Sequence, residues 1–151
     1  MKKDVKKLAE KLVLGLKPFC KKIQVAGSIR SKKENPFDID IVLIPKNREK
    51  LEEFLKTKGR RIQGGEHEST WKIESVKVEL YYTIEDEWGA TLLAYSGEKG
   101  PNIGLRKIAK KKGFLLNNHG LFKNGKKIAS KSETDIYHAL GRHYKKAWNR
   151  K

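Results

Sequence analysis

The run Asp38-Ile39-Asp40-Ile41-Val42-Leu43-Ile44 decides the fold. Apart from Asp40, its last six residues are β-branched or apolar, which predicts a buried strand. Side chains alternate between the two faces of a strand, so Asp38 and Asp40 point the same way. Two such carboxylates repel each other and need a cation, a proton or a base beside them. They suit Mg²⁺ with a phosphate substrate; the alternative is a solvent-exposed pair at a strand edge.

A second strand-like run, residues 76–83, supplies a third carboxylate. Its apolar side chains alternate along one face, which places Glu79 on the other face. If the two strands are neighbours, Glu79 joins Asp38 and Asp40 in one acidic cluster. Three carboxylates can hold two divalent cations about 3.5–4 Å apart, the arrangement used for two-metal phosphoryl transfer.

A short turn, Gly27-Ser28-Ile29-Arg30, precedes the aspartates. Together with Asp38, Asp40 and Glu79 it resembles the nucleotidyltransferase palm of family X DNA polymerases, the DNA polymerase beta group. The Gly-Ser turn and the Asp-x-Asp pair alone mark the wider nucleotidyltransferase superfamily. The second half of the chain makes the resemblance specific to family X. In all, the resemblance covers roughly residues 5–145.

Two segments of the second half carry that narrower resemblance. Tyr95-Ser96-Gly97, followed by Asn102 and Arg106, has the spacing of the family's nucleotide- and template-contacting segment. Residues 132–141 read like the family's C-terminal ending. The resemblance implies that Tyr95, Gly97 and Asn102 shape the sugar and base pocket, and that Arg106 meets the template side of the new pair.

The resemblance also implies roles for the first half. Asp38 and Asp40 would bind two Mg²⁺ ions, for which Mn²⁺ can substitute, and Glu79 would bind the catalytic ion. The triphosphate would be held by Gly27, Ser28 and Arg30. The sequence departs from the family at two of these places, with Glu79 where aspartate is usual and Ser31 where a second arginine is common.

The implied fold class is α+β. A nucleotidyltransferase palm, a mixed sheet with helices on one side, is expected in residues 1–93, and a small α/β C-terminal subdomain that binds nucleotide and template in residues 94–151. Hydrophobic periodicity and turn residues predict the following elements: helices at 5–16, 48–58, 85–95, 101–112 and 133–140, strands at 23–26 and 39–44, and hairpins at 71–83 and around Asn124-Gly125. The basic tail 142–151 is expected to be partly disordered.

Charge is unevenly distributed along the chain. Lys and Arg number 35 against 18 acidic residues, a net charge of +17. Residues 1–22 carry net +6 and residues 99–151 net +13, whereas residues 23–98 carry net −2. This distribution favours a nucleic-acid partner over a uniformly charged thermostable surface, and the absence of a long apolar run disfavours a membrane. The expected DNA contacts are Lys107, Lys110, Lys111 and Lys112.

The single cysteine, Cys20, allows no internal disulfide, and the lysine-rich N-terminus has no apolar core of a signal peptide. An intracellular monomer is therefore expected. The function implied is that of a DNA-directed DNA polymerase that adds deoxynucleoside triphosphates to a primer 3′-hydroxyl on gapped or nicked DNA, in DNA repair. Two alternatives remain: a template-independent nucleotidyltransferase acting on RNA or small acceptors, and a non-catalytic nucleic-acid-binding protein.

Overall fold

The structure, a computed structural model, describes residues 4–96 and 99–150, without the side chains of residues 99–101. The chain forms two compact units, Met1–Thr83 and Ile84–Lys151. The division predicted at 93/94 would assign residues 84–93 to the first unit. The helix of residues 88–94 instead packs within the second unit, against the helix of residues 133–139 and the strand of residues 120–123.

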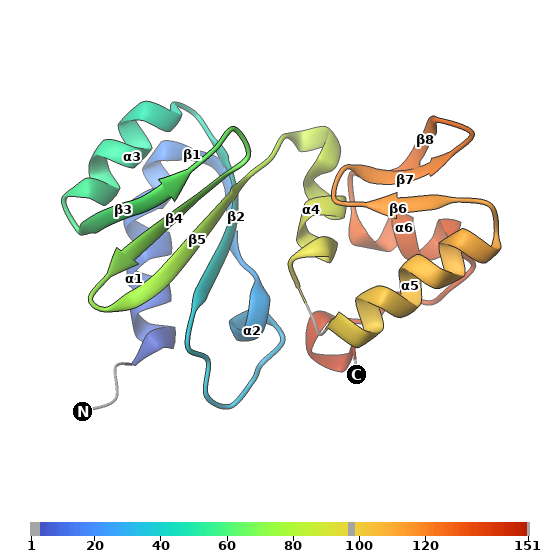
Figure 1. Cartoon of the computed structure of the whole chain (residues 1–151), viewed down its shortest axis with the longest axis horizontal. Coiled ribbons are helices and arrows are strands. Elements are labelled where there is room, and N and C mark those ends of the chain that lie inside the picture. Colours follow the sequence, from blue (N-terminus) through green and yellow to red (C-terminus); the bar gives the residue numbers. More distant parts are fainter. Residues whose placement is uncertain (1–3, 97–98, 151) are drawn as a thin grey trace. The chain divides into compact units, whose positions relative to one another are not determined.

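The first unit contains a five-stranded mixed sheet with the order β1-β2-β5-β4-β3 (Figure 1). Its strands are β1 (Cys20–Val25), β2 (Ile39–Pro45), β3 (Gly59–Gly64), β4 (Glu68–Ile73) and β5 (Val76–Tyr82). Strands β2 and β5 run parallel, and the other neighbours are antiparallel. The predicted α+β class with a mixed sheet is therefore confirmed.

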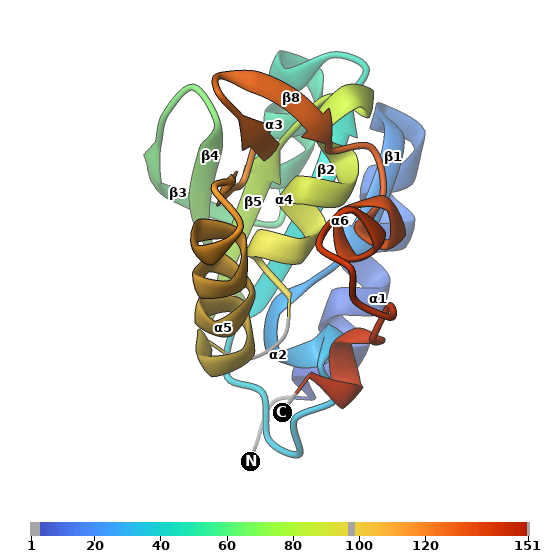
Figure 2. The same cartoon turned by 90° about the vertical axis from the view of Figure 1, so that its right-hand side faces the viewer.

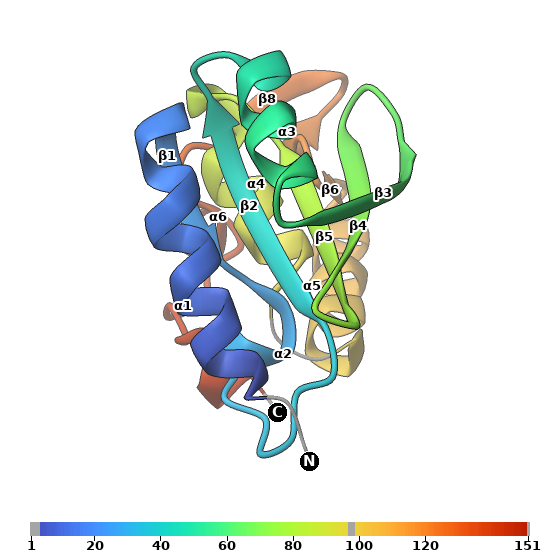
Figure 3. The same ribbon diagram turned by 90° about the vertical axis from the view of Figure 1, so that its left-hand side faces the viewer.

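Two helices cover one face of this sheet, α1 (Val5–Leu16) and α3 (Arg48–Lys56) (Figure 3). Asp4 caps the N-terminus of α1: its side chain accepts a hydrogen bond from the Lys7 backbone N–H at 3.1 Å. The three-to-four-residue spacing of its leucines turns them toward the sheet. The core beneath both helices includes Leu8, Leu12, Leu16, Ile39, Ile41, Leu43, Leu51, Leu55, Trp71, Val78 and Leu80.

The second unit is smaller and has its own core; Figure 2 shows its helices α4, α5 and α6. It contains helices α4 (Trp88–Ala94), α5 (Lys99–Lys111) and α6 (Glu133–Ala139), and an antiparallel sheet of β6 (Leu115–Asn117), β7 (Gly120–Lys123) and β8 (Lys126–Ala129). Helix α4 packs against α6 and β7, and α5 packs against β6. Leu93, Leu105, Leu121, Ile136 and Leu140 are among the buried residues of this core.

Both predicted hairpins are present. Glu74 and Ser75 join β4 to β5 with φ of 50° and 69°, and Asn124 and Gly125 join β7 to β8 with φ of 51° and 76°. Positive φ at both central residues is what a two-residue hairpin turn requires. The remaining short elements are α2 (Gly27–Arg30) and the 3₁₀ turns η1 (Lys17–Phe19), η2 (Glu85–Glu87) and η3 (Ala147–Asn149).

The C-terminal residues differ from the expectation of partial disorder. Within the described residues, the segment 142–150 contains the turn η3 and ends on Arg150, which is 2% exposed. The guanidinium of Arg150 forms an ion pair with Glu133 of α6, with 3.1 Å between Nη1 and Oε2. A buried ion pair anchors this segment, which a count of basic residues does not reveal.

Two other properties of the chain follow from burial and length. Cys20 is 6% exposed, and burial raises the pKa of its thiol to about 11, against a smaller lowering effect of Lys46. None of the helices in the described part of the chain has the length and apolar character needed to span a membrane.

Gly89 provides a test of the packing of α4. A Cβ at Gly89 would overlap the backbone of Ser132, whereas a Cβ at Gly104, also in a helix, would meet nothing within 4 Å. We expect Gly89→Ala to destabilise the protein by about 1–3 kcal/mol through overpacking. Gly104→Ala is the matched control and should be neutral or stabilising, by up to about 1 kcal/mol. Urea denaturation measures both; equal stabilities would contradict the packing of α4 against Ser132.

Candidate active site

Asp40 and Glu79 lie directly beside each other on neighbouring strands. The parallel pairing of β2 with β5 brings Asp40 into register with Glu79. Ile39 and Ile41 are in the core beneath the helices, so strand alternation places Asp40 on the opposite face of the sheet. The cluster is therefore a product of strand register, and it lies on the face that α1 and α3 do not cover.

Asp38 precedes β2 and is exposed. Its negative charge still acts on Asp40, where it contributes to a raised pKa. All three predicted carboxylates thus belong to one electrostatic group, although the structure buries them to very different degrees.

Two side chains of β5 contact this group. The Tyr81 hydroxyl donates hydrogen bonds to Asp40 Oδ1, at 3.2 Å, and to Glu79 Oε2. The Lys77 ammonium lies 2.8 Å from Glu79 Oε1. Because a hydroxyl carries a single hydrogen, Tyr81 serves one carboxylate at a time. Lys77 and Tyr81 therefore offset part of the negative charge of the pair.

The two paired carboxylates differ in pKa. Burial, followed by the negative charge of Glu79, raises the pKa of Asp40 to about 6. Burial also acts to raise the pKa of Glu79, but the hydrogen bonds from Lys77 and Tyr81 outweigh it, and the pKa of Glu79 is lowered. Glu79 is therefore the more readily ionised carboxyl group of the pair. A positive partner would stabilise the charged form of Asp40 more than that of Glu79.

Gly27, the first residue of the turn, lies against the Asp40 side chain. It has φ of 59°, and a Cβ there would overlap the Asp40 carboxylate. The neighbouring Ala26 N–H donates to the Asp40 backbone carbonyl at 2.7 Å. Only glycine satisfies both the conformation and the close approach. The predicted turn and the predicted aspartate are therefore in contact, and Ser28 and Arg30 belong to the same helical turn, α2, which begins at Gly27.

The donor chemistry of these residues fits a divalent cation. Carboxylate oxygens are the ligands that Mg²⁺ prefers, and a cation would relieve the raised pKa of Asp40. In the arrangement described here, no group of three His, Cys, Asp or Glu side chains from the described residues is positioned to hold a metal ion. The Tyr81 hydroxyl instead hydrogen-bonds one oxygen of Asp40 and one of Glu79.

The predicted nucleotide residues of the second unit can be placed in part. Asn102 and Arg106 line one small depression of α5, together with Ala94 and Asn117. The Asn102 side-chain amide donates to the Ser96 carbonyl at 3.2 Å, and its Oδ1 is buried with no hydrogen-bond donor among the described residues.

The other predicted residues of this unit are Tyr95, which follows α4 and is half-buried, and Gly97, which lies outside the described residues. The predicted DNA contacts on and after α5 are exposed: Lys107, Lys110, Lys111 and Lys112.

Two residues of the site, Lys77 and Tyr81, had no assigned role in the sequence analysis. They could have been found from strand alternation, because they share the face of Glu79.

Comparison with known proteins gives matches in both units. Residues 91–151 match the family description "DNA polymerase beta thumb". Over 144 residues the chain is 26% identical to Repair DNA polymerase X of African swine fever virus (isolate Pig/Kenya/KEN-50/1950), covering 86% of this chain and 82% of the viral protein. The protein of strain Badajoz 1971 Vero-adapted matches equally well.

A more local similarity is higher in identity. Over 59 residues the chain is 41% identical to DNA polymerase IV of Saccharomyces cerevisiae, which covers 39% of this chain and 10% of the yeast protein. The viral match includes the carboxylate-bearing unit, and the thumb match covers most of the other. The thumb match and these similarities together support a family X DNA polymerase, of the DNA polymerase beta group.

Proposed function

We propose that this chain is a DNA-directed DNA polymerase of DNA repair, which adds nucleotides to a primer 3′-hydroxyl on gapped or nicked DNA. The observation that carries the proposal is the contact of Gly27 with Asp40, beside Glu79, in a chain whose other unit is a polymerase thumb. The turn would bind the triphosphate, and the carboxylates beside it would support metal-assisted chemistry on the same phosphate groups.

The residues that would hold two divalent cations, Mg²⁺ or Mn²⁺, are Asp38, Asp40 and Glu79. Bound there, the cations would lower the pKa of the primer hydroxyl and neutralise charge on the triphosphate. Tyr81 competes for the same carboxylate oxygens, and Lys77 keeps Glu79 ionised before anything binds. Before a cation binds, the negative charge of the carboxylates would thus be partly offset by Lys77 and Tyr81.

The residues of α2 would hold the triphosphate. Because Gly27 contacts Asp40, any group bound by Gly27, Ser28 and Arg30 lies next to the carboxylates. The absence of a side chain at Gly27 also lets a ligand approach the backbone closely.

The second unit would supply the sugar and base pocket. The buried Oδ1 of Asn102 lacks a donor among the described residues and could accept a hydrogen bond from a nucleotide. Tyr95 and Gly97 would complete this pocket, and Arg106 would meet the template. Exposed lysines on α5 would contact the phosphates of DNA, and a monomer acting inside the cell stays our prediction.

Primer extension tests the proposed reaction. We expect Asp38→Asn and Glu79→Ala to lower the rate of nucleotide addition on a gapped duplex by about 100-fold or more, because each removes a carboxylate that would hold a divalent cation beside the reacting phosphates. Glu68→Gln, on the exposed surface of β4, is the matched control and should retain activity. Equal extension of a single-stranded DNA or an RNA end by the wild type would instead point to a template-independent transferase.

The pKa of Asp40 predicts a pH dependence of stability. Its pKa is about 6 in the folded protein and 3.8 ordinarily, so the folded state binds the extra proton between these values. Stability from this group is complete below about pH 4 and is lost as the pH rises to about 6, by up to about 3 kcal/mol. Asp40→Asn should therefore be more stable than the wild type at pH 7.

Thermal denaturation without nucleotide, with and without Mg²⁺, checks this prediction. Mg²⁺ should raise the Tm of the wild type and of Glu68→Gln, and should leave that of Asp40→Asn unchanged. A variant less stable than the wild type at pH 7 would show that the Asp40 charge is already satisfied in the metal-free protein.

The salt dependence of DNA affinity tests the role of α5. Each neutralised phosphate contributes about −0.9 to the log–log slope, so six contacts give a slope of roughly −5. Replacing Lys110, Lys111 and Lys112 by alanine should make the slope shallower by roughly 3. The matched control replaces three exposed lysines of the first unit, Lys50, Lys56 and Lys72. A slope that changes only in the control would place the DNA contacts elsewhere.

A further inference from the structure

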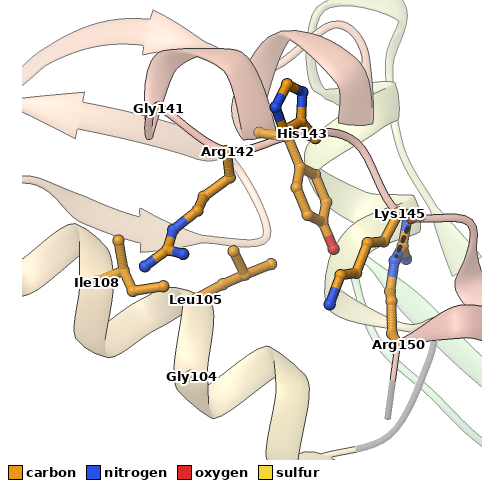
Figure 4. Close-up of a pocket in the computed structure, with 9 residues that line it drawn as sticks. Gly104, Leu105, Ile108, Gly141, Arg142, His143, Lys145 and Arg150 are labelled. Atoms are coloured by element: carbon orange, nitrogen blue, oxygen red, sulfur yellow. Dashed lines mark hydrogen bonds between the residues drawn. The ribbon is translucent and has the colours of Figure 1, made fainter.

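Two hollows of the second unit differ in chemical character. One, of about 410 Å³, lies beside Arg150 between α5, the end of α6 and the C-terminal segment (Figure 4). Its lining includes Arg142, Lys145 and Arg150, and the phosphates of the proposed DNA substrate would account for these cations. The other, of about 430 Å³, lies between the end of α5 and the turn that joins β7 to β8. We call it the apolar hollow; none of the described residues that line it is charged, and the proposed reaction does not use it.

Three large apolar side chains line the apolar hollow: Phe114, Leu115 and Phe122. Leu115 of β6 pairs directly with Phe122 of β7, and the next pair along the two strands is Leu116 with Leu121. Leu116 and Leu121 are buried in the core of the second unit. Since successive side chains of a strand point to opposite faces, Leu115 and Phe122 lie on the face that is turned away from this core.

The exposure of this outer pair is not explained by folding. Leu115 is 61% exposed, Phe122 is half-buried, and neither belongs to the core cluster of the described residues. The outer face of an antiparallel sheet is ordinarily polar. Single exposed apolar side chains are common on soluble proteins, whereas a group of them around a concave surface marks a place where another molecule binds.

The segment that forms the apolar hollow carries only positive charge. Residues 99–132 contain ten lysines and arginines and no acidic residue. Lys123 and Lys126, both exposed, come directly before and after the turn Asn124-Gly125, which lines one side of the hollow. An apolar surface with a cationic rim is complementary to a partner that combines an apolar side chain with carboxylates.

The contacts of the lining favour a protein segment over a nucleic acid. The Lys123 ammonium lies over the Phe114 ring, 5.6 Å from its centroid, and the Lys127 ammonium lies 5.8 Å from the Phe122 centroid. A base could not stack on a ring face that a lysine already covers. Lys127 also forms an ion pair with a carboxylate of η2 at 2.7 Å, which offsets the charge it could offer to a phosphate. The exposed side chain of Leu115 is aliphatic, so it provides packing area but no ring for a base.

We propose that the apolar hollow is a docking site for an acidic protein segment that carries a large apolar side chain. This side chain packs between Phe114, Leu115 and Phe122, and the carboxylates of the segment pair with Lys123 and Lys126. The site lies entirely within the second unit and does not depend on the proposed function. Docking there would bring the chain to a partner protein without using a residue assigned to the reaction.

Selection of short random peptides displayed on phage tests the proposal, with the intact protein as bait. Peptides that also bind Leu115→Asp are removed, since this variant places a negative charge in the apolar hollow at an exposed position. We expect the remaining peptides to be rich in aspartate and glutamate and to share a leucine, isoleucine, phenylalanine or tryptophan. A selection that leaves no such peptides would overturn the proposal.

Fluorescence anisotropy of the most enriched peptide, synthesised with a dye, measures its affinity. Leu115→Ser and Lys126→Glu should each weaken binding by about tenfold or more, a change of about 1.4 kcal/mol. The matched controls are Leu14→Ser, at a leucine of α1 that is 70% exposed, and Lys50→Glu, at an exposed lysine of α3. Both should bind as the wild type does, and equal affinities of Leu115→Ser and Leu14→Ser would contradict docking at the hollow.

Nuclear magnetic resonance locates the bound peptide. The amide signals of Gly113 and Gly125, which line the apolar hollow, should shift saturably during a titration with the peptide. The signal of Gly15 in α1 should stay in place. Shifts confined to other parts of the chain would overturn the proposal. Unchanged spectra and Tm values without peptide confirm that each variant is folded.

The affinity for gapped DNA separates docking from the proposed function. Leu115→Ser should bind gapped DNA and extend a primer as the wild type does. A loss of DNA affinity in this variant without a loss of peptide binding would identify the surface as a nucleic-acid contact and overturn the proposal. Failure of the wild type to extend any primer would overturn the polymerase assignment and leave the peptide results standing.

Discussion

The repulsion between Asp40 and Glu79 is the constraint on which the first unit depends. Parallel strand pairing places these carboxylates side by side, and burial makes their charges costly. Lys77 and Tyr81, two positions on either side of Glu79 in β5, offset part of this cost. Gly27, which has no side chain, leaves room for the Asp40 side chain. Each of these residues is explained by the cluster, whereas the helices on the other face are explained by the core.

Part of this arrangement could be predicted from the sequence. Alternation in residues 38–44 and 76–83 assigns faces correctly, and turn residues such as Asn124-Gly125 mark a hairpin. Alternation does not say which strands are neighbours, so the register of Asp40 with Glu79 needed the structure. Strand β3 escaped prediction because its side chains are mostly exposed and polar, and β6 because it is only three residues long.

The C-terminal segment shows a different limit of sequence reasoning. A run of basic residues predicts solvation and disorder when each charge is counted alone. Arg150 instead pairs with Glu133, seventeen positions earlier, and lies over the rings of Tyr137 and Tyr144. Long-range pairing of opposite charges leaves no periodic signal in the sequence. The pocket beside Arg150 could not be predicted for the same reason, because the residues that line it are far apart in the chain.

The burial of Cys20 has a practical consequence for spectroscopy. Thiol-reactive dyes attack the thiolate, and this thiol is both enclosed and held protonated at neutral pH. A cysteine introduced at Gly65, where a side chain would meet nothing, or at the exposed Lys126 would therefore react while Cys20 stays unlabelled. With one dye on each unit, energy transfer between the dyes can be measured while the chain binds DNA, and Cys20 does not have to be replaced first.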